Sequence, residues 1–424
     1  MPCCGTPFAS VRLGHLKCLT LYRTEDLLLA DNSGYCLLHV AAKLGNLRVI
    51  NYLIDKAPCL MDARNDLHET PLIVAANYGQ IHVVCRLLDT PHNEALQRAC
   101  HQDKNGTTCL LGAVEKSDNE IALFLLKRFG KTLCAIGNKL GMLPLHVAAS
   151  NGNVEFIRIA TKYDQKMVHI KDSFGSVPLI YAIQSKCIMS IRYLVEKAKS
   201  DVKTKTSKGQ TLLHVACING DVPTIKYFLN ILGTETILVA TNDLANCLHC
   251  ATFHGNIDAL KLLVEYWPKK KRKGVLGIRD SRGNTPLHLA AINNHSLIAQ
   301  YLISYLVNTR ATNNLSQTAL EIARKRNAHA VFKIIKTFEG ALRFLRSTQS
   351  DDDCSTLIPD PPRTVVAKNG KPLDGNHLHM PNQDVFHKNM PTQFIPMTQY
   401  ANGKMYDDEA FSVIAEIDKV LENA

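Results

Sequence analysis

The sequence lacks a long apolar segment, a secretory signal and the common catalytic motifs. No run of eighteen apolar residues occurs, so we expect no transmembrane segment. The first five residues lack the basic start and apolar core of a signal peptide, and we therefore expect a cytoplasmic protein whose fourteen cysteines are reduced. No phosphate-binding loop and no Gly-x-Ser-x-Gly elbow is present. These absences predict a protein that is not an enzyme and that uses no cofactor.

Charge is distributed unevenly along the chain, whose net charge is +11. From Asp351 onward there are twelve acidic residues and six Lys or Arg, a net charge of −6, which leaves +17 for the first 350 residues. This asymmetry is typical of a basic body with an acidic appendage that folds back on it. A solvated surface and tail would give the same count.

A pattern of 33 to 39 residues occurs nine times, and its best copy starts at Thr285 and Pro286, which together favour the start of a helix. A short apolar helix follows, Asn294 ends it, and residues 297–303 form a second, amphipathic helix. Such short helix pairs bury their apolar faces only when copies are stacked. The leucine of the first helix marks the copies at Leu38, Leu72, Leu110, Leu145, Leu179, Leu213, Leu248, Leu287 and Leu320. Seven residues after each marker comes the break between helices, and fifteen after it comes an apolar core position of the second helix.

This pattern resembles the ankyrin repeat, which has a period of about 33 residues and a Thr-Pro-Leu-His-x-Ala signature. The match is complete at residues 285–290, good at residues 144–148 and 213–216, and degenerate around Leu110 and Leu320. The resemblance covers residues 8–340 and implies an all-α solenoid of about nine repeats that binds other macromolecules. Residues 8–22 keep the second half of a repeat and are expected to form an N-terminal half-repeat cap. The layout, without a motif, is similar to the ankyrin head of the espin and forked actin-bundling proteins.

Outside the array we expect a flexible N-terminus at residues 1–7, a disordered linker rich in Pro and Asp at residues 341–405, and an amphipathic helix at residues 406–424. The helix could dock in a groove of a partner or of the array itself. Its apolar docking face comprises Val413, Ile414, Ile417 and Leu421. At the other end, Cys3 and Cys4 could form a paired S-acylation site.

The long step before Leu287 contains Pro268 followed by five consecutive basic residues, Lys269, Lys270, Lys271, Arg272 and Lys273. An insertion between repeats is expected to be an exposed loop. Pro-Lys-Lys-Lys-Arg-Lys is similar to a nuclear localisation signal, which an import receptor binds as an extended basic strand. A solvated loop or a contact with an acidic surface or a phosphate remains the alternative. The long step before Leu110 is likewise expected to lengthen a loop.

The resemblance also implies which positions face the concave binding groove. They lie six, five and three residues before each marker and five and six after it. Large apolar or aromatic side chains at these positions are typical of a protein-binding surface. The predicted groove residues are Tyr35, Leu67, Tyr78, Leu140, Met142, Phe174, Ile218, Phe253 and Ile292.

Other clusters are explained by the repeat. Cys247, His249 and Cys250 could suggest a metal site, but they occupy the Pro, His and aliphatic places of one copy, so we predict no metal ligands. The histidines that follow the marker are expected to join loops through hydrogen bonds. These positions are His39, His146, His214, His249 and His288.

The sequence therefore favours a non-enzymatic scaffold or adaptor that binds an extended peptide or a helix of a protein partner, with no nucleic acid expected. One alternative is a nuclear co-regulator, imported through residues 268–273 by an import receptor, that binds a transcription factor. A second alternative is an ankyrin-bearing component of a ubiquitin ligase or of an actin-linked complex. The sequence does not identify the partner.

Overall fold

The computed structural model describes the backbone of residues 4–348 and the side chains of residues 4–344. Residues 1–336 form one compact unit, and α23 (His329–Thr348) extends into a second unit. Within the described part, regular structure consists of helices and three isolated bridges. No helix in that range is long and apolar enough to cross a membrane.

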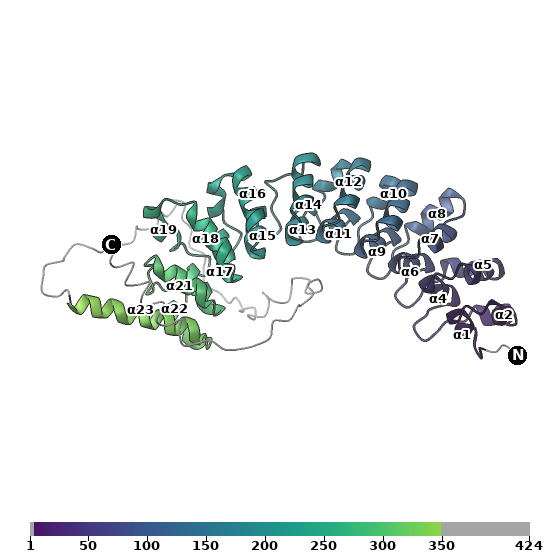
Figure 1. Ribbon diagram of the computed structural model, residues 1–424, viewed down its shortest axis with the longest axis horizontal. Coiled ribbons are helices and arrows are strands. Elements are labelled where there is room, and N and C mark those ends of the chain that lie inside the picture. Colours follow the sequence, from purple (N-terminus) through teal and green to yellow (C-terminus); the bar gives the residue numbers. More distant parts are fainter. Residues whose placement is uncertain (1–3, 349–424) are drawn as a thin grey trace, which may run out of the picture. The chain divides into compact units, whose positions relative to one another are not determined.

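The first helices of the repeats pack against one another in chain order and form an inner row (Figure 1). Each begins next to the marker leucine, in several copies at a Pro that has no backbone amide to leave unpaired. The inner row consists of α4 (Leu37–Leu44), α6 (Pro71–Asn77), α9 (Cys109–Glu115), α11 (Pro144–Ser150), α13 (Pro178–Gln184), α15 (Leu212–Asn219), α17 (Cys247–Phe253), α20 (Pro286–Ile292) and α22 (Ala319–Lys325).

The second helix of a repeat packs against the first helix of the same repeat, and together the second helices form an outer row beside the inner row (Figure 1). They are α5 (Leu47–Lys56), α7 (Ile81–Leu87), α10 (Asn119–Cys134), α12 (Val154–Tyr163), α14 (Ile188–Arg192) with the π-helical turn η3 (Tyr193–Lys197), α16 (Val222–Leu232), α18 (Ile257–Glu265), α21 (Ser296–Ser304) and α23. Short 3-10 helices follow three of them: η1 (Pro58–Asp62), η2 (Gln165–His169) and η4 (Thr234–Leu238).

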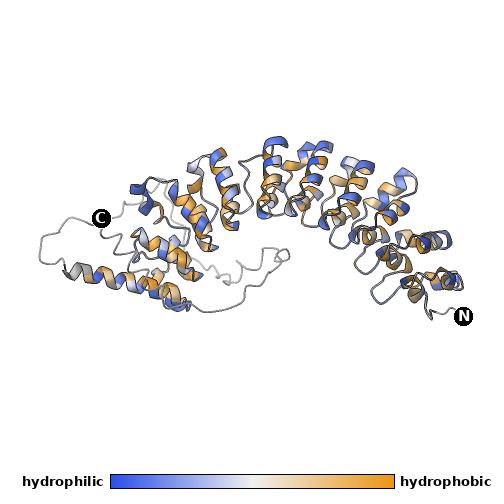
Figure 2. Ribbon diagram, in the orientation of Figure 1, coloured by the Kyte–Doolittle hydropathy of each residue, from blue (hydrophilic) through white to orange (hydrophobic). Residues whose placement is uncertain are grey.

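The core lies between the two rows, where hydrophobic residues of each pair face neighbouring helices (Figure 2). Eight of the nine marker leucines are buried, and Leu320, in the last copy, is half-buried. All nine predicted core positions of the second helices are buried: Leu53, Leu87, Leu125, Ala160, Leu194, Phe228, Leu263, Leu302 and Ile335. The stacked-pair prediction is confirmed.

The predicted break between the two helices is a left-handed residue in every copy. Gly45, for example, has φ 74° and donates its amide to the carbonyl of Ala42, which ends α4. Glycine adopts this conformation without steric cost, whereas Ser117, Lys186, Asn294 and Asn327 adopt it with a side chain. The chain therefore reverses direction at the same offset in all nine copies.

The N-terminal end contains one more helix than the predicted half-repeat. In addition to α2 (Leu16–Leu19), the structure has an inner helix, α1 (Pro7–Arg12), which packs against α4. Thr6 caps α1 by accepting a hydrogen bond from the amide of Ala9. A short helix, α3 (Thr24–Leu27), then leads into the first full repeat. The first repeat is thus covered by a complete, though short, helix pair.

Both long steps between repeats contain a short helix where the sequence predicted a loop. They are α8 (His92–Ala99) and α19 (Lys269–Val275), and α19 contains the whole basic segment. The prediction of an extended basic loop is therefore wrong. At the end of the array, α23 continues to Thr348, so residues 341–348 are helical although the sequence assigned them to a linker. The remaining linker and the predicted helix at 406–424 lie outside the described residues.

Candidate functional site

Each repeat begins with a tight turn, here called the finger. In seven of the nine repeats its shape depends on an Asp or Asn seven residues before the marker, and Thr206 and Thr241 take that place in the other two. In the fourth repeat, Asn138 Oδ1 accepts hydrogen bonds from the amides of Leu140 and Met142, both at 3.0 Å. Such an Asx turn holds the backbone while leaving the intervening side chains exposed. The same arrangement occurs at Asp31, Asn65, Asp103, Asn138, Asp172, Asp280 and Asn313. Sequence reasoning missed these residues, although their constant offset from the marker was a readable signal.

Backbone hydrogen bonds connect consecutive fingers. The amide of Ser173 donates to the carbonyl of Leu140 at 2.9 Å, and the amide of Ser207 donates to the carbonyl of Phe174 at 3.0 Å. At the second finger, the carbonyl of Leu67 accepts from the amide of Lys104 at 2.8 Å. The polar backbone atoms of these predicted groove residues are thus used within the stack, which leaves their side chains as the groups available for binding.

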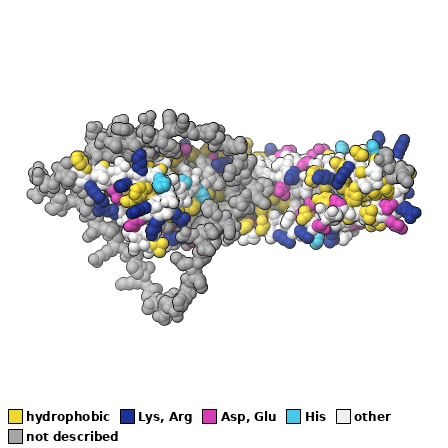
Figure 3. Space-filling view, turned by 90° about the horizontal axis from the view of Figure 1, so that it is seen from below, with side chains coloured by type: hydrophobic (Ala, Val, Ile, Leu, Met, Phe, Trp, Pro, Cys, Tyr) yellow, Lys and Arg dark blue, Asp and Glu magenta, His cyan; other side chains and the backbone are white. Residues whose placement is uncertain are grey.

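The surface formed by the fingers and the C-terminal ends of the inner helices is here called the inner face. Four predicted groove residues are large and well exposed on it: Leu67 and Tyr78 at 52%, Leu140 at 42% and Phe174 at 37%. The other five, Tyr35, Met142, Ile218, Phe253 and Ile292, are half-buried. No predicted groove residue is a core residue. Figure 3 shows hydrophobic side chains among basic and acidic ones over the N-terminal repeats.

A polar network links predicted groove positions in the first two repeats. The Tyr35 hydroxyl donates to Glu69 Oε2 at 3.1 Å, and the side-chain amides of Asn65 and Asn77 donate to the same carboxylate at 2.7 and 3.4 Å. Desolvation, followed by the Glu69 charge, raises the pKa of Tyr35 to about 12. Because Tyr35 and Glu69 belong to successive fingers and Asn77 ends α6, the finger and inner-helix positions lie on one surface.

Lysine and aromatic side chains also meet on the inner face. Lys43 Nζ lies 4.7 Å from the centre of the Tyr78 ring, a cation–π distance between the ends of α4 and α6. Further along the stack, the backbone carbonyl of Phe253 accepts hydrogen bonds from the side-chain amide of Asn293 at 2.7 Å and from His295 Nε2 at 3.0 Å. These bonds hold the end of α17 against the next repeat, while the Phe253 side chain stays half-buried.

The five histidines that follow the marker are buried and hydrogen-bonded at both ring nitrogens. In His214, Nδ1 accepts from the amide of Thr211 at 3.2 Å, and Nε2 donates to the carbonyl of Ala245, in the next finger, at 3.2 Å. Desolvation lowers the pKa of His214 to about 4 and also lowers the pKa of the other four. The neutral rings therefore join repeats, as the sequence predicted.

The cysteine-rich sequence of the seventh repeat belongs to its core. Cys247 and Cys250 are buried, and desolvation raises the pKa of both thiols. Both ring nitrogens of His249 are used, because Nδ1 accepts from the amide of Asn246 and Nε2 donates to the carbonyl of Ile278. The repeat therefore accounts for this cluster.

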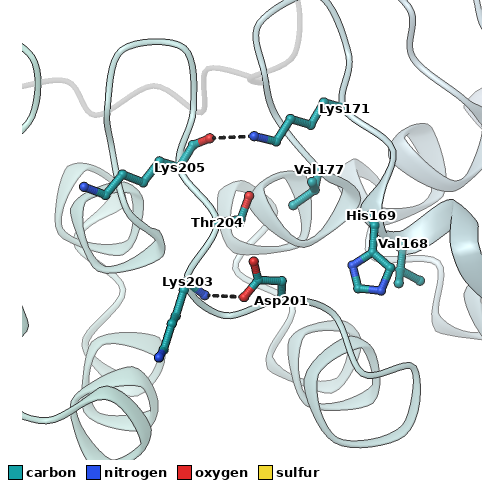
Figure 4. A pocket seen from close by; sticks show the side chains of 8 residues that line it. All are labelled: Val168, His169, Lys171, Val177, Asp201, Lys203, Thr204 and Lys205. Carbon is teal, nitrogen blue, oxygen red and sulfur yellow. Dashed lines mark hydrogen bonds between the residues drawn. The ribbon is translucent and has the colours of Figure 1, made fainter.

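A hollow of about 340 Å³ lies between the fifth and sixth repeats (Figure 4). Its basic lining includes Lys171, Lys203 and Lys205, and Lys171 Nζ donates to the carbonyl of Lys205 at 3.5 Å. Figure 4 shows the three ammonium groups apart from one another, with that of Lys171 directed at the Lys205 carbonyl. The hollow adds positive charge to the fingers but is not arranged around a single anion.

The basic segment is a helix with one tethered residue. Arg272 is half-buried, and its guanidinium donates to the carbonyls of Trp267 at 2.9 Å and Glu265 at 3.3 Å, at the end of α18. The four lysines, Lys269, Lys270, Lys271 and Lys273, are exposed. The structure thus separates one structural arginine from four accessible cations. The other predicted docking element, with Val413, Ile414, Ile417 and Leu421, lies outside the described residues.

Comparisons with known proteins agree with this architecture. A family model described as ankyrin repeats (3 copies) matches residues 38–136, 113–206 and 198–274, and one described as ankyrin repeats (many copies) matches residues 276–323. A Saccharomyces cerevisiae protein named probable 26S proteasome regulatory subunit p28 is 30% identical over 206 residues, 48% of this chain and 87% of that protein.

Other similar proteins are longer than the matched region. The Arabidopsis thaliana protein ACCELERATED CELL DEATH 6 is 31% identical over 159 residues, 34% of this chain and 24% of that protein. The Gallus gallus nuclear factor NF-kappa-B p105 subunit is 22% identical over 223 residues, 51% of this chain and 22% of that protein. The similarity to these two proteins is therefore confined to less than a quarter of their length.

Proposed function

We propose that this chain, which belongs to the ankyrin-repeat family, is a non-enzymatic scaffold that binds an extended segment of a protein partner along its inner face. Proteins of this family generally mediate protein–protein interactions. The observation that carries the proposal is the exposure of Leu67, Tyr78, Leu140 and Phe174 on fingers and helix ends whose backbone is held by hydrogen bonds. A rigid support lowers the entropy lost when a partner binds.

The inner face suggests the chemistry of the bound segment. Lys139 is exposed directly before Leu140, and Lys43 and Lys208 are exposed at other inner-face positions. The first 350 residues carry a net charge of +17. A segment that places apolar side chains on the finger residues and acidic side chains between them would complement this surface. Steering by such charge mainly accelerates association and weakens as salt concentration rises.

Two relatives support a role within larger assemblies. The yeast protein is named a probable regulatory subunit of the 26S proteasome, and the chicken protein is named a subunit of a nuclear factor. Each name describes a component that acts with other chains. A scaffold function requires only the inner face described above.

The proposal is tested with the double variant Leu140→Glu, Phe174→Glu, which places two negative charges on neighbouring fingers. Proteins captured by the tagged wild-type chain are quantified by mass spectrometry, and the binding of each candidate is then measured with purified components. We expect the true partner to bind the variant at least about tenfold more weakly, because two exposed apolar anchors are lost. Thermal unfolding should change little, because both side chains lie outside the core.

A matched control replaces Met189, which is 63% exposed in α14, an outer helix. Met189→Glu adds the same charge to an exposed apolar position away from the fingers. Equal loss of binding in this variant and in the double variant would mean that general charge controls capture, and it would contradict the proposal. Unchanged binding by the double variant would contradict it as well.

We also propose nuclear import through α19, which the four exposed lysines Lys269, Lys270, Lys271 and Lys273 favour. An import receptor that takes an extended strand must first unwind α19 and break the Arg272 hydrogen bonds. Replacing Lys270 and Lys271 with Ala should move a fluorescently tagged chain from the nucleus to the cytoplasm. Exclusion of the unaltered chain from the nucleus would refute this second proposal and leave scaffolding untouched.

A further inference from the structure

Three potential metal ligands converge at the N-terminal end of the stack. Cys4 precedes α1, His15 lies at the start of α2, and Cys18 lies within α2. Cys4 Sγ is 3.0 Å from His15 Nδ1, and the ligand atoms of all three residues lie within 4.8 Å of one another. Among the described residues, no other group of three His, Cys, Asp or Glu side chains converges in this way.

Cys18 occupies a buried position of the second helix of the cap. Gly14 is the left-handed residue between α1 and α2, with φ 68°. Four residues after the corresponding break, the next four repeats place a buried hydrophobic side chain, and the fifth and sixth place buried Ser190 and Thr224. Cys18 is buried as well, and its Sγ lies within 4.8 Å of the ligand atoms of Cys4 and His15.

His15 takes the place that begins the second helix, which His295 takes in the eighth repeat. One residue after the break, the first and fourth repeats have Asn46 and Asn153. Their side-chain oxygens accept hydrogen bonds from the backbone amides of Val49 and Phe156, which caps the second helix. The side chain of His15 makes no such capping bond. Its Nδ1 is directed at Cys4 instead. The cap is distinguished by the meeting of Cys4 with His15 and Cys18, and not by either repeat position alone.

The spacing of the three atoms suits zinc. Tetrahedral zinc has bonds of about 2.3 Å to sulfur and about 2.0 Å to nitrogen, so its ligand atoms lie roughly 3.5 to 3.8 Å apart. Side-chain adjustments of about 1 Å would bring Cys4, His15 and Cys18 to these separations. Two thiolates and one imidazole form a soft donor set that favours zinc over magnesium or calcium.

We propose that Cys4, His15 and Cys18 bind a zinc ion that fastens the N-terminal cap. The ion would connect the segment before α1 to α2, across two helices of only six and four residues. The cap covers the first full repeat through α1, which packs against α4. His15 is exposed, so solvent or a further donor reaches the fourth coordination position from that side. Sequence reasoning assigned no metal ligands and missed this group, because its members are 11 and 3 residues apart and do not form a known motif.

The test is titration of the reduced, full-length chain with Zn²⁺ and Co²⁺. We expect one equivalent of zinc to bind tightly, and the cobalt form to show thiolate-to-cobalt charge transfer and the intense visible bands of tetrahedral cobalt. Cys4→Ser and His15→Ala should each weaken zinc binding by at least about tenfold, because a three-residue site loses a ligand. Cys4 lies before the first helix, so its replacement tests the site without altering the core.

Cys59→Ser is the matched control, because Cys59 is an exposed thiol remote from the cap in sequence. It should bind zinc as tightly as the unaltered chain. Absence of stoichiometric zinc binding by the reduced chain would overturn the proposal. So would a cobalt spectrum unchanged by Cys4→Ser and His15→Ala, since the metal would then be held by other residues.

Discussion

At the scale of single residues, the five buried histidines are the most regular polar feature of the stack. Each ring accepts a hydrogen bond from a backbone amide of its own repeat and donates one to a backbone carbonyl that leads into the next repeat. Protonation would turn the accepting nitrogen into a donor that faces another donor, in a buried site where an added charge is unfavourable. These contacts between repeats therefore require neutral imidazole.

This requirement predicts a loss of stability in mild acid. The folded pKa of His214 is about 4, whereas unfolded histidine has a pKa of about 6.5. Between these values the unfolded chain binds more protons than the folded chain, so the free energy of unfolding falls as pH decreases. The contribution of His214 is fully present above pH 6.5 and is lost towards pH 4, on the order of 3 kcal/mol in total. Urea denaturation at several pH values measures it.

The control for the pH prediction is a comparison of two variants. His214→Gln should show a smaller decrease between pH 6.5 and 4 than the unaltered chain, because it removes one group that titrates on unfolding. His82→Gln, at an exposed position in α7, should keep the full decrease. If the free energy of unfolding of both variants depends on pH as it does in the unaltered chain, the neutral form of His214 does not stabilise its repeat.

At the scale of elements, the reversal between the two helices of a repeat requires a left-handed residue. Lys186 fulfils this role between α13 and α14 with φ 56°. A residue with a side chain pays roughly 1 to 2 kcal/mol to adopt this conformation. Glycine avoids that cost but loses more backbone entropy on folding, which offsets part of the gain. Lys186→Gly should therefore raise the free energy of unfolding by about 0.5 to 1 kcal/mol, as measured by urea denaturation.

The reciprocal change provides the comparison for the Lys186 variant. Gly152 has φ 66°, and a Cβ atom there would lie 3.1 Å from the Cβ of Cys187. Gly152→Ala should therefore lower the free energy of unfolding. An unchanged or lower stability of Lys186→Gly would show that contacts of the Lys186 side chain outweigh the backbone cost.

The elements also show which structural features a sequence can predict. The marker leucine, the break and the core position are set by local helix geometry and burial, so constant offsets identified them in degenerate copies as well. The helix α19 was not predicted, because consecutive lysines suggest a solvated loop. Lysine nevertheless favours helix, and the Arg272 guanidinium binds carbonyls at the end of the preceding helix. That contact depends on where two segments meet in space.

The candidate site was predictable in position but not in detail. The offsets from the marker placed all nine groove residues outside the core, which the structure shows. They did not indicate that the Glu69 carboxylate accepts hydrogen bonds from Tyr35, Asn65 and Asn77. These bonds depend on side-chain rotamers in two neighbouring fingers, which a sequence offset does not specify. The Cys4, His15 and Cys18 group was missed because its members are 11 and 3 residues apart and do not form a known motif.

At the scale of the whole molecule, the stack is held together by contacts between neighbours. The inner helices pack in chain order, finger bonds connect each repeat to the next, and the five buried histidines add contacts of this kind in their repeats. Stability in such an array is approximately a sum over repeats and their interfaces, and the terminal repeats need covering. The short pair α1 and α2 provides that cover at one end, which gives the proposed zinc ligands a structural purpose at the place where the stack has fewest neighbours.

The last prediction concerns the charge difference between the array and the C-terminal residues. Residues from Asp351 onward have a net charge of −6, against +17 for the first 350. Opposite charges attract at low ionic strength, so we expect the presence of these acidic residues to slow amide hydrogen exchange in the fingers and in α19. A chain ending at residue 348 should exchange faster there than the full chain. The difference should vanish in 1 M salt, where charges are screened beyond about 3 Å. Identical exchange by the two chains at low salt would mean that the acidic residues leave the inner face open to partners.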